Sequence, residues 1–230
     1  METKKLFQQL ARKDANKDKL AASVIRKPEL APELVAALGS DQAAVKFSAS
    51  KILLLISERA PAVVYPSLHS FIDLLDCENK ILKWGAVRVI GNLAEVDSKN
   101  IIDRVLEKYL EPISGPELVT AANVIAGATK IAMAKPRLID RIVRAILNVE
   151  KARYKTSMCR NVALGRAIDA FDQLYGRSKL QGAISKLVKK QLRNPRNATR
   201  KKAEKFIKRR LTSGASKGRA GRDGAGKKAM

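Results

Sequence analysis

A segment of similar sequence recurs along this chain at a nearly fixed spacing. The stretch LGSDQAAVKFSASKIL begins at Leu38, and LDCENKILKWGAVRVI begins 37 residues later at Leu75. Each has an apolar end, a short polar turn, and an aliphatic residue followed by lysine, with alanine three positions after that lysine. A fixed period of this length indicates a repeat architecture, in which each unit buries its apolar side against its neighbours. The lysine–alanine pairs are Lys46 with Ala49 and Lys83 with Ala86.

Three weaker copies extend the repeat toward the C-terminus. The first begins at Val119 and keeps the frame, but it has Thr120 in place of the basic residue. The other two keep a basic residue, Arg160 or Arg200, with alanine three positions later. Spacings between the key positions are 37, 37, 40 and 40 residues, which predicts five related units.

Each unit has the pattern of two helices. Aliphatic residues within 83–94 and 119–133 recur with the helical period of about 3.6 residues, and no long stretch alternates as a strand does. We therefore expect an all-α chain with about twelve helices between Lys4 and Leu211. We expect the prolines to mark the other turn of each unit, in the first turn of a helix, where a missing N–H costs nothing. These are Pro28, Pro32, Pro61, Pro66, Pro112, Pro116, Pro136 and Pro195. Small residues would let neighbouring helices approach closely; examples are Ala86, Gly91, Ala122, Gly127 and Gly165.

This pattern resembles HEAT repeats, the helix pairs of one class of armadillo-like α-solenoid. The segment 74–94 carries the resemblance most completely. The family often has aspartate in the turn within the repeat and a basic residue at the start of the second helix. Asp41 with Lys46 and Asp76 with Lys83 match that pattern, whereas the later units match it only in part. The resemblance covers roughly residues 28–211 and implies a right-handed α-solenoid. A plain helical bundle is the alternative, although a bundle has no reason to repeat at fixed spacing.

The positive charge is concentrated near the C-terminus. The chain of 230 residues has 46 basic and 22 acidic residues and a formal charge of +24. Residues 186–230 hold 17 of the basic residues and two of the acidic ones, a net +15, which leaves +9 for residues 1–185. From Thr212 onward the composition is mainly Gly, Ala, Ser, Lys and Arg, with no large apolar residue before Met230, and it cannot bury enough apolar surface to fold. We expect a helical domain over 1–211 and a disordered basic tail over 212–230.

Several features favour the cytoplasm. No apolar run approaches the ~18 residues that a membrane span needs, and the first residues lack the apolar region of a signal peptide. The two cysteines, Cys77 and Cys159, lie too far apart for a CxxC motif and have the apolar surroundings of buried thiols in a reducing compartment. We therefore expect a cytoplasmic protein that does not bind a membrane.

The sequence offers little for catalysis. His69 is the only histidine, so we expect no metal site and no cofactor. An alternative comes from resemblance, because alkylpurine DNA glycosylases of one bacterial family are basic HEAT-like solenoids of about this size. Catalysis in that family is associated with tryptophans in the groove and a nearby carboxylate. Here Trp84 is the only tryptophan, and Arg88 rather than a carboxylate lies one helical turn further on. We expect a protein without enzymatic activity.

Binding is the function that the sequence favours. The second helices of a HEAT-like stack line its concave face, and basic residues on that face would suit an acidic protein or a phosphate backbone. The alternative is that each one is an ordinary solvated residue or bonds within its own repeat. The predicted partner-binding residues are Lys46, Lys83, Arg88, Lys130, Arg160 and Arg166.

The C-terminal region is a second candidate surface. Its basic block has almost no counter-charge, so it favours an anionic partner and sequence-independent contact with DNA or RNA. The predicted nucleic-acid-binding residues are Arg200, Lys201, Lys202, Lys205, Lys208, Arg209 and Arg210. The sequence therefore predicts a non-catalytic scaffold for a protein partner, with additional non-specific affinity for nucleic acid.

Overall fold

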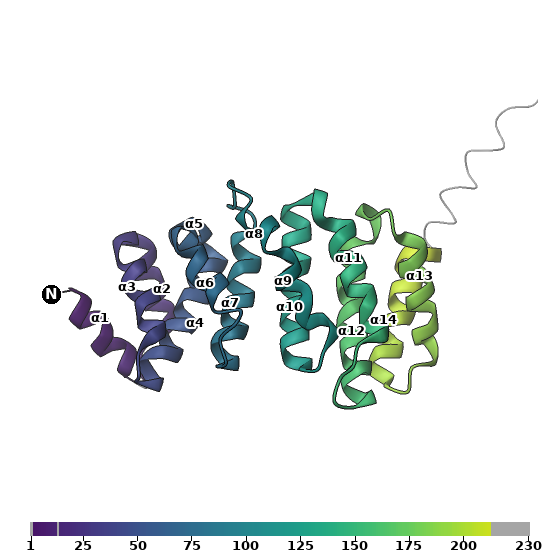
Figure 1. The fold of residues 1–230 in the computed structure, drawn as a ribbon, viewed down its shortest axis with the longest axis horizontal. Coiled ribbons are helices and arrows are strands. Elements are labelled where there is room, and N and C mark those ends of the chain that lie inside the picture. Colours follow the sequence, from purple (N-terminus) through teal and green to yellow (C-terminus); the bar gives the residue numbers. More distant parts are fainter. Residues whose placement is uncertain (1, 13, 213–230) are drawn as a thin grey trace, which may run out of the picture.

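The chain forms a row of antiparallel helix pairs. The structure, a computed structural model, describes residues 2–12 and 14–212, with the side chains of residues 2–5 left out. Within these residues every regular element is a helix or a helical turn. The helices run across the long axis of the molecule, and the pairs follow one another from α1 at one end to α14 at the other (Figure 1). The all-α solenoid that the sequence predicts is confirmed, whereas the predicted tail after Thr212 lies outside the described residues.

Five long helices are the second members of their pairs. They are α4 (Ala43–Arg59), α7 (Lys80–Leu93), α10 (Leu118–Ala134), α12 (Ser157–Leu174) and α14 (Asn197–Ile207). The first members are shorter or broken: α3 (Ala31–Ala36), α5 (Pro61–Val64) with α6 (Leu68–Asp73), α8 (Ile101–Arg104) with α9 (Leu106–Leu110), α11 (Ile139–Leu147) and α13 (Gln181–Lys190). Two further helices, α1 (Glu2–Ala11) and α2 (Lys17–Arg26), precede them.

Short helical turns complete the pairs. The 3-10 turns are Pro28–Leu30, Ala37–Gly39, Tyr65–Ser67, Glu111–Ser114, Pro136–Leu138, Asn148–Lys151, Tyr175–Arg177 and Gln191–Arg193, and a π-helical turn, Lys208–Thr212, follows α14. Most prolines occupy the first turn of one of these elements, as predicted. The prediction is wrong for Pro116 and Pro195, which lie in the turns just before α10 and α14. Asn194 has the extended backbone that a following proline favours.

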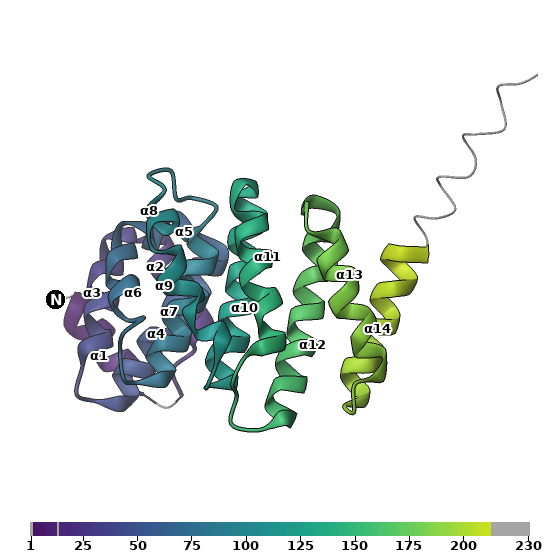
Figure 2. The same cartoon turned by 45° about the vertical axis from the view of Figure 1, so that its right-hand side comes forward.

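The second helices form one continuous layer. α2 packs on α4, and α4, α7, α10, α12 and α14 then pack each on the next. Figure 2 shows α11 and α13 beside this layer in the later pairs. The buried apolar side chains of all pairs belong to one connected core, so each pair covers the apolar side of its neighbour.

Glycines bring α7 and α10 into close contact. A Cβ atom at Gly91 would lie 2.8 Å from the Cα atom of Gly127. A Cβ atom at Gly127 would lie 1.9 Å from the hydroxyl oxygen of Tyr109. That hydroxyl is buried and donates a hydrogen bond of 2.8 Å to the carbonyl oxygen of Val87. Burial raises the pKa of Tyr109, so the hydroxyl keeps the proton that it donates.

A buried ion pair fixes the loop between α7 and α8. The Lys135 ammonium lies 3.0 Å from a carboxylate oxygen of Asp97, and both side chains are at most 5% exposed. Asp97 also accepts hydrogen bonds from the backbone N–H groups of Ile101 and Ile102 and from the Tyr65 hydroxyl. Burial opposes ionisation of Asp97, but the Ile102 amide, Lys135 and the other donors outweigh it and lower its pKa. This cluster therefore connects three successive pairs.

Candidate binding surfaces

The exposed side of the second helices, here called the second-helix face, has an ordered pattern of side chains. The second residue of each of these helices is apolar and exposed. The three large ones are among the most exposed large apolar side chains described: Ile81 at 50%, Val119 at 47% and Met158 at 54%. They occupy equivalent positions in neighbouring parallel helices, so they line up across the solenoid. We call this set the apolar row: Ala44, Ile81, Val119, Met158 and Ala198.

Basic side chains follow two helical turns further along the same side of the helices. They occupy the ninth position in α4, α7 and α14 and the tenth in α12, whereas α10 has Ala126 at its ninth position and a lysine one turn later. Residues separated by seven positions lie on the same side of a helix. All five basic side chains are exposed. We call this set the basic row: Lys51, Arg88, Lys130, Arg166 and Lys205.

Most of the basic row has no carboxylate partner among the described residues. Lys51, Arg166 and Lys205 form no ion pair there, and the Lys130 ammonium donates to the side-chain oxygen of Asn92. Arg88 lies 3.4 Å from Glu58, and both side chains are more than a third exposed, so this pair is weak. The row therefore presents positive charge that remains available to a partner.

The far ends of the second helices are acidic. Glu58, Glu95 and Asp172 each lie fifteen residues after the first residue of their helix, and Met133 has the same position in α10. Glu58 faces Arg88, and Asp172 accepts a hydrogen bond of 2.8 Å from Arg210. On α4, α7 and α12 the face thus changes from apolar to basic to acidic at or just beyond the end of the helix, whereas α10 has Met133 there and no described carboxylate follows Lys205 on α14.

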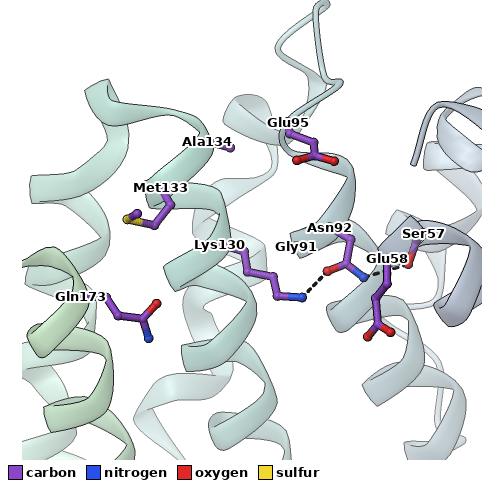
Figure 3. A pocket seen from close by; sticks show the side chains of 9 residues that line it. All are labelled: Ser57, Glu58, Gly91, Asn92, Glu95, Lys130, Met133, Ala134 and Gln173. Atoms are coloured by element: carbon purple, nitrogen blue, oxygen red, sulfur yellow. Dashed lines mark hydrogen bonds between the residues drawn. The ribbon is translucent and has the colours of Figure 1, made fainter. Parts of the chain in front are cut away.

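The largest hollow of this face lies where α4, α7 and α10 meet (Figure 3). It has a volume of about 450 Å³, and Gly91, Ala134 and Met133 contribute to its lining. Lys130 points across it to Asn92, whose side-chain amide donates to Ser57 at 2.8 Å (Figure 3). A second hollow of about 240 Å³ lies between α10 and α12. The larger hollow exists because Gly91 and Ala134 have little or no side chain to fill it.

The predicted partner-binding residues divide into two groups. Arg88, Lys130 and Arg166 lie in the basic row, as predicted for an exposed stripe. Lys46, Lys83 and Arg160 do not, because each is the fourth residue of its helix and lies on another side. Lys83 shares its side of α7 with the buried residues Val87 and Ile90. The sequence repeat singled out these three residues because a basic residue recurs at the fourth position of the second helices. That position does not point in the same direction as the ninth position, where most of the basic row lies.

The predicted nucleic-acid-binding residues are partly occupied by contacts within the fold. Lys202 pairs with Asp169, and Arg209 and Arg210 both pair with Asp172. The Arg200 guanidinium donates to the carbonyl oxygens of Asn194, at 2.9 Å, and Pro195, at 3.3 Å. Lys201, Lys205 and Lys208 are exposed.

Other basic residues that the sequence did not single out lie in the turns of the last two pairs. Arg153, Arg193 and Arg196 precede the second helices α12 and α14, and none of them forms an ion pair within the described residues. The sequence could have identified them as candidates, because each lies in the predicted turn before a second helix. At the previous turn a hydrogen bond from Lys80, together with the charge of Lys155, lowers the pKa of Glu117.

The structure gives no catalytic or metal arrangement within its described residues. No group of three or more metal-ligating side chains is found there. His69 is exposed on α6, and the two cysteines are free and half-buried rather than buried as predicted. The Trp84 indole is half-buried and donates a hydrogen bond of 2.9 Å to the Thr120 hydroxyl, which links α7 to α10. No described helix is both long and apolar enough to cross a membrane.

Comparison with known proteins supports the fold. No protein-family model matches the chain, and no curated protein matches it. A designed armadillo repeat protein is similar in structure, with a TM-score of 0.61 at 17% identity over 90% of each chain. An engineered protein gives a TM-score of 0.63 at 17% identity, over 90% of this chain and 89% of that one.

The fold is therefore an α-solenoid of stacked helix pairs, of the HEAT and armadillo type. The first neighbour is a designed armadillo repeat protein and the second is an engineered protein. At this level of identity the likeness concerns the fold alone.

Proposed function

We propose that the protein is a non-catalytic binding scaffold that holds a protein partner on its second-helix face. The observation that carries this proposal is the alignment of exposed apolar and basic side chains across five successive helices. Isolated exposed apolar side chains are ordinary, but a row of them at one repeated position marks an interaction surface. Free thiols at Cys77 and Cys159 support a reducing location, and we place the protein in the cytoplasm.

A photo-crosslinking experiment tests the scaffold proposal. Ala126 is exposed at the centre of the second-helix face, so a photo-crosslinking amino acid there would report what this face contacts in cells. The matched control carries the same amino acid at Ala183, which is exposed on α13 outside the face. We expect a defined protein adduct from position 126 and none from position 183. Equal capture at the two positions, or none at 126, contradicts the proposal.

We also propose that the C-terminal pair and the tail bind nucleic acid without sequence preference. Residues 181–212 contain twelve basic residues and one acidic residue, a net charge of +11. Contacts with Glu150, Asp169 and Asp172 occupy four of these charges, those of Lys190, Lys202, Arg209 and Arg210. Among the twelve, Arg193 and Arg196 lie just before α14 and carry guanidinium groups that suit phosphate oxygens.

Salt dependence tests the nucleic-acid proposal. Each phosphate contact releases counterions, so affinity for a fluorescent duplex should fall steeply between 50 mM and 200 mM salt, on the order of tenfold or more. Arg193→Gln with Arg196→Gln, and separately Lys201→Gln with Lys205→Gln, should each weaken binding and reduce the salt slope. Arg104→Gln on α8 is the control, because Arg104 is exposed elsewhere and forms no ion pair with any described residue. Binding that is insensitive to salt and to these variants contradicts the proposal.

The glycosylase alternative is not supported by the site. Trp84 is engaged with Thr120 between two helices, and the residue one turn further, Arg88, pairs with Glu58. A flipped base needs an open aromatic platform and a carboxylate beside it. If the wild-type protein released methylated purines from DNA and Trp84→Ala did not, the glycosylase hypothesis would be supported instead.

A further inference from the structure

The chemistry of the second-helix face specifies its partner more closely. We infer that this face binds an extended acidic segment in which apolar and acidic side chains alternate, an inference that rests on the proposed scaffold function. The apolar row and the basic row run side by side across the same helices, and the basic row keeps charge that no described carboxylate neutralises.

The separation of the two rows fits the width of an extended chain. Seven or eight residues separate the two rows on α4, α7, α12 and α14, a rise of about 10–12 Å. On α10 eleven residues separate Val119 from Lys130, a rise of about 16 Å. An extended chain directs successive side chains to opposite sides. A segment lying between the rows therefore sends one set of side chains to Ile81, Val119 and Met158 and the alternate set to the basic residues.

The length of the face sets the length of the segment. Adjacent packed helices lie about 8–10 Å apart, so the four intervals from α4 to α14 span roughly 32–40 Å. An extended chain advances about 3.3 Å per residue, so about ten to twelve residues cross the whole face. Ala44 and Ala198 end the apolar row with small side chains, which places the large apolar contacts in the middle.

Charge and apolar surface together favour an acidic peptide over nucleic acid on this face. A phosphate backbone would satisfy Lys51, Arg88, Arg166 and Lys205 but would leave Ile81, Val119 and Met158 against polar phosphate and sugar. None of the exposed large apolar side chains described is aromatic, so this face offers no platform for base stacking. Carboxylate side chains alternating with apolar ones satisfy both rows at once.

Three labelled peptides test the inference on the full chain. The first is a fluorescein-labelled 12-residue peptide of alternating leucine and glutamate; the others replace glutamate by lysine or leucine by serine. We expect the leucine–glutamate peptide to bind and each replacement to weaken binding by about tenfold or more, as loss of interface anchors does. Equal binding of the three peptides, absence of binding, or preference for the lysine peptide overturns the inference.

Paired variants locate the site. Ile81→Ser with Val119→Ser and Met158→Ser removes the apolar row, and Arg88→Gln with Arg166→Gln removes part of the basic row. Each set should lower the affinity for the leucine–glutamate peptide by about tenfold. The matched controls, Leu192→Ser and Arg104→Gln with Arg144→Gln, should leave this affinity unchanged. The controls are exposed residues of the same types outside the face. Circular dichroism confirms that every variant is folded.

The outcomes separate this inference from the scaffold proposal. If a protein is captured from position 126 but the row variants bind the acidic peptide as the wild type does, the inference fails and the scaffold function stands. If the peptide binds as expected but no cellular protein is captured, the scaffold function fails. Complete displacement of the peptide from the face by duplex DNA at low concentration also overturns the inference, since nucleic acid would then be its occupant.

Discussion

Individual residues set how closely the pairs can pack, and Gly127 is the tightest such position. A methyl group there would meet the buried hydroxyl of Tyr109 at 1.9 Å and the carbonyl oxygen of Val87 at 3.1 Å. Tyr109 cannot move aside without losing its hydrogen bond to Val87. At this position the absence of a side chain is therefore a structural requirement of the α7–α10 contact.

We predict that Gly127→Ala lowers the free energy of unfolding by about 2 kcal/mol or more, because overpacking a close contact forces backbone shifts. Gly182→Ala is the matched control: it lies in α13 and a methyl group there meets nothing within 4 Å. That change should be neutral or stabilising by up to ~1 kcal/mol, because alanine favours the helix. Urea unfolding of the two variants measures the difference, and equal destabilisation would contradict the packing argument.

The buried pair of Asp97 and Lys135 gives a pH-dependent prediction. Asp97→Asn removes one of the two carboxylates that lie 3.0 Å from the buried Lys135 ammonium, and Asp103 remains, so we expect a loss of about 3 kcal/mol at pH 7. The folded pKa of Asp97 is lowered, so its contribution is present above the unfolded value of about 3.9 and is lost as the pH falls through the folded value. The difference between wild type and variant should therefore shrink below about pH 4.

Urea unfolding at pH 7, 5 and 3 checks this pH dependence. Asp76→Asn is the control, because Asp76 is 70% exposed and pairs with an exposed lysine. Its effect should be no more than about 1 kcal/mol at pH 7. If the difference in free energy of unfolding between wild type and Asp97→Asn stays constant down to pH 3, the lowered pKa of Asp97 is contradicted.

At the scale of single elements, two of the five second helices, α7 and α12, begin with a side-chain cap. The Asn79 side chain accepts hydrogen bonds from the backbone N–H groups of Ile81 and Leu82 at the start of α7. Thr156 caps α12 in the same way, through the N–H group of Cys159. α4 begins after Gln42, whose side chain makes no capping bond. The start of α7 is thus fixed locally, beside the first large side chain of the apolar row.

We predict that Asn79→Ala lowers the free energy of unfolding by about 1 kcal/mol, the usual value of an N-cap. Gln42→Ala should change it by less than about 0.5 kcal/mol, because no cap is lost there. Thermal unfolding of both variants measures the effect. A similar loss in the two variants would show that the cap of α7 contributes nothing specific.

The helix pairs were predictable from the sequence, whereas the basic row was predictable only in part and the apolar row was not. The repeated aliphatic-lysine-alanine pattern follows directly from the packing of each second helix, so Lys46, Lys83, Arg160 and Arg200 marked the elements correctly. That same regularity drew attention to the fourth position, which does not lie in the row of Arg88, Lys130 and Arg166. The fourth and ninth positions are five residues apart, about 140° around the helix axis, so they lie on different sides of the helix. The apolar row was missed because single exposed apolar residues carry no signal until the helices are aligned.

At the scale of the whole molecule, ion pairs between neighbouring helix pairs share a direction. In most of them the carboxylate belongs to the earlier pair and the basic residue to the later one. Examples are Asp103 with Arg137 at 2.8 Å, Glu107 with Arg141 at 2.6 Å, Glu150 with Lys190 at 2.7 Å and Asp172 with Arg210 at 2.8 Å. The last pair has a single acidic residue, Glu204, so its outer side cannot continue the series.

This directional pairing gives a prediction for the last helix pair. Asp172 is the carboxylate partner of both Arg209 and Arg210, so Asp172→Asn removes two ion pairs that hold α14 and its final turn to α12. Because each pair of a solenoid contacts only its neighbours, the loss should loosen the end without loosening the centre. We expect hydrogen exchange in α14 to rise while exchange in α7 and α10 stays at the wild-type rate.

Trp84, the only tryptophan, lies between α7 and α10 and reports the centre separately. In urea, the circular dichroism of the variant should therefore begin to fall before the tryptophan fluorescence changes, and coincident transitions would indicate that the solenoid unfolds as one cooperative unit.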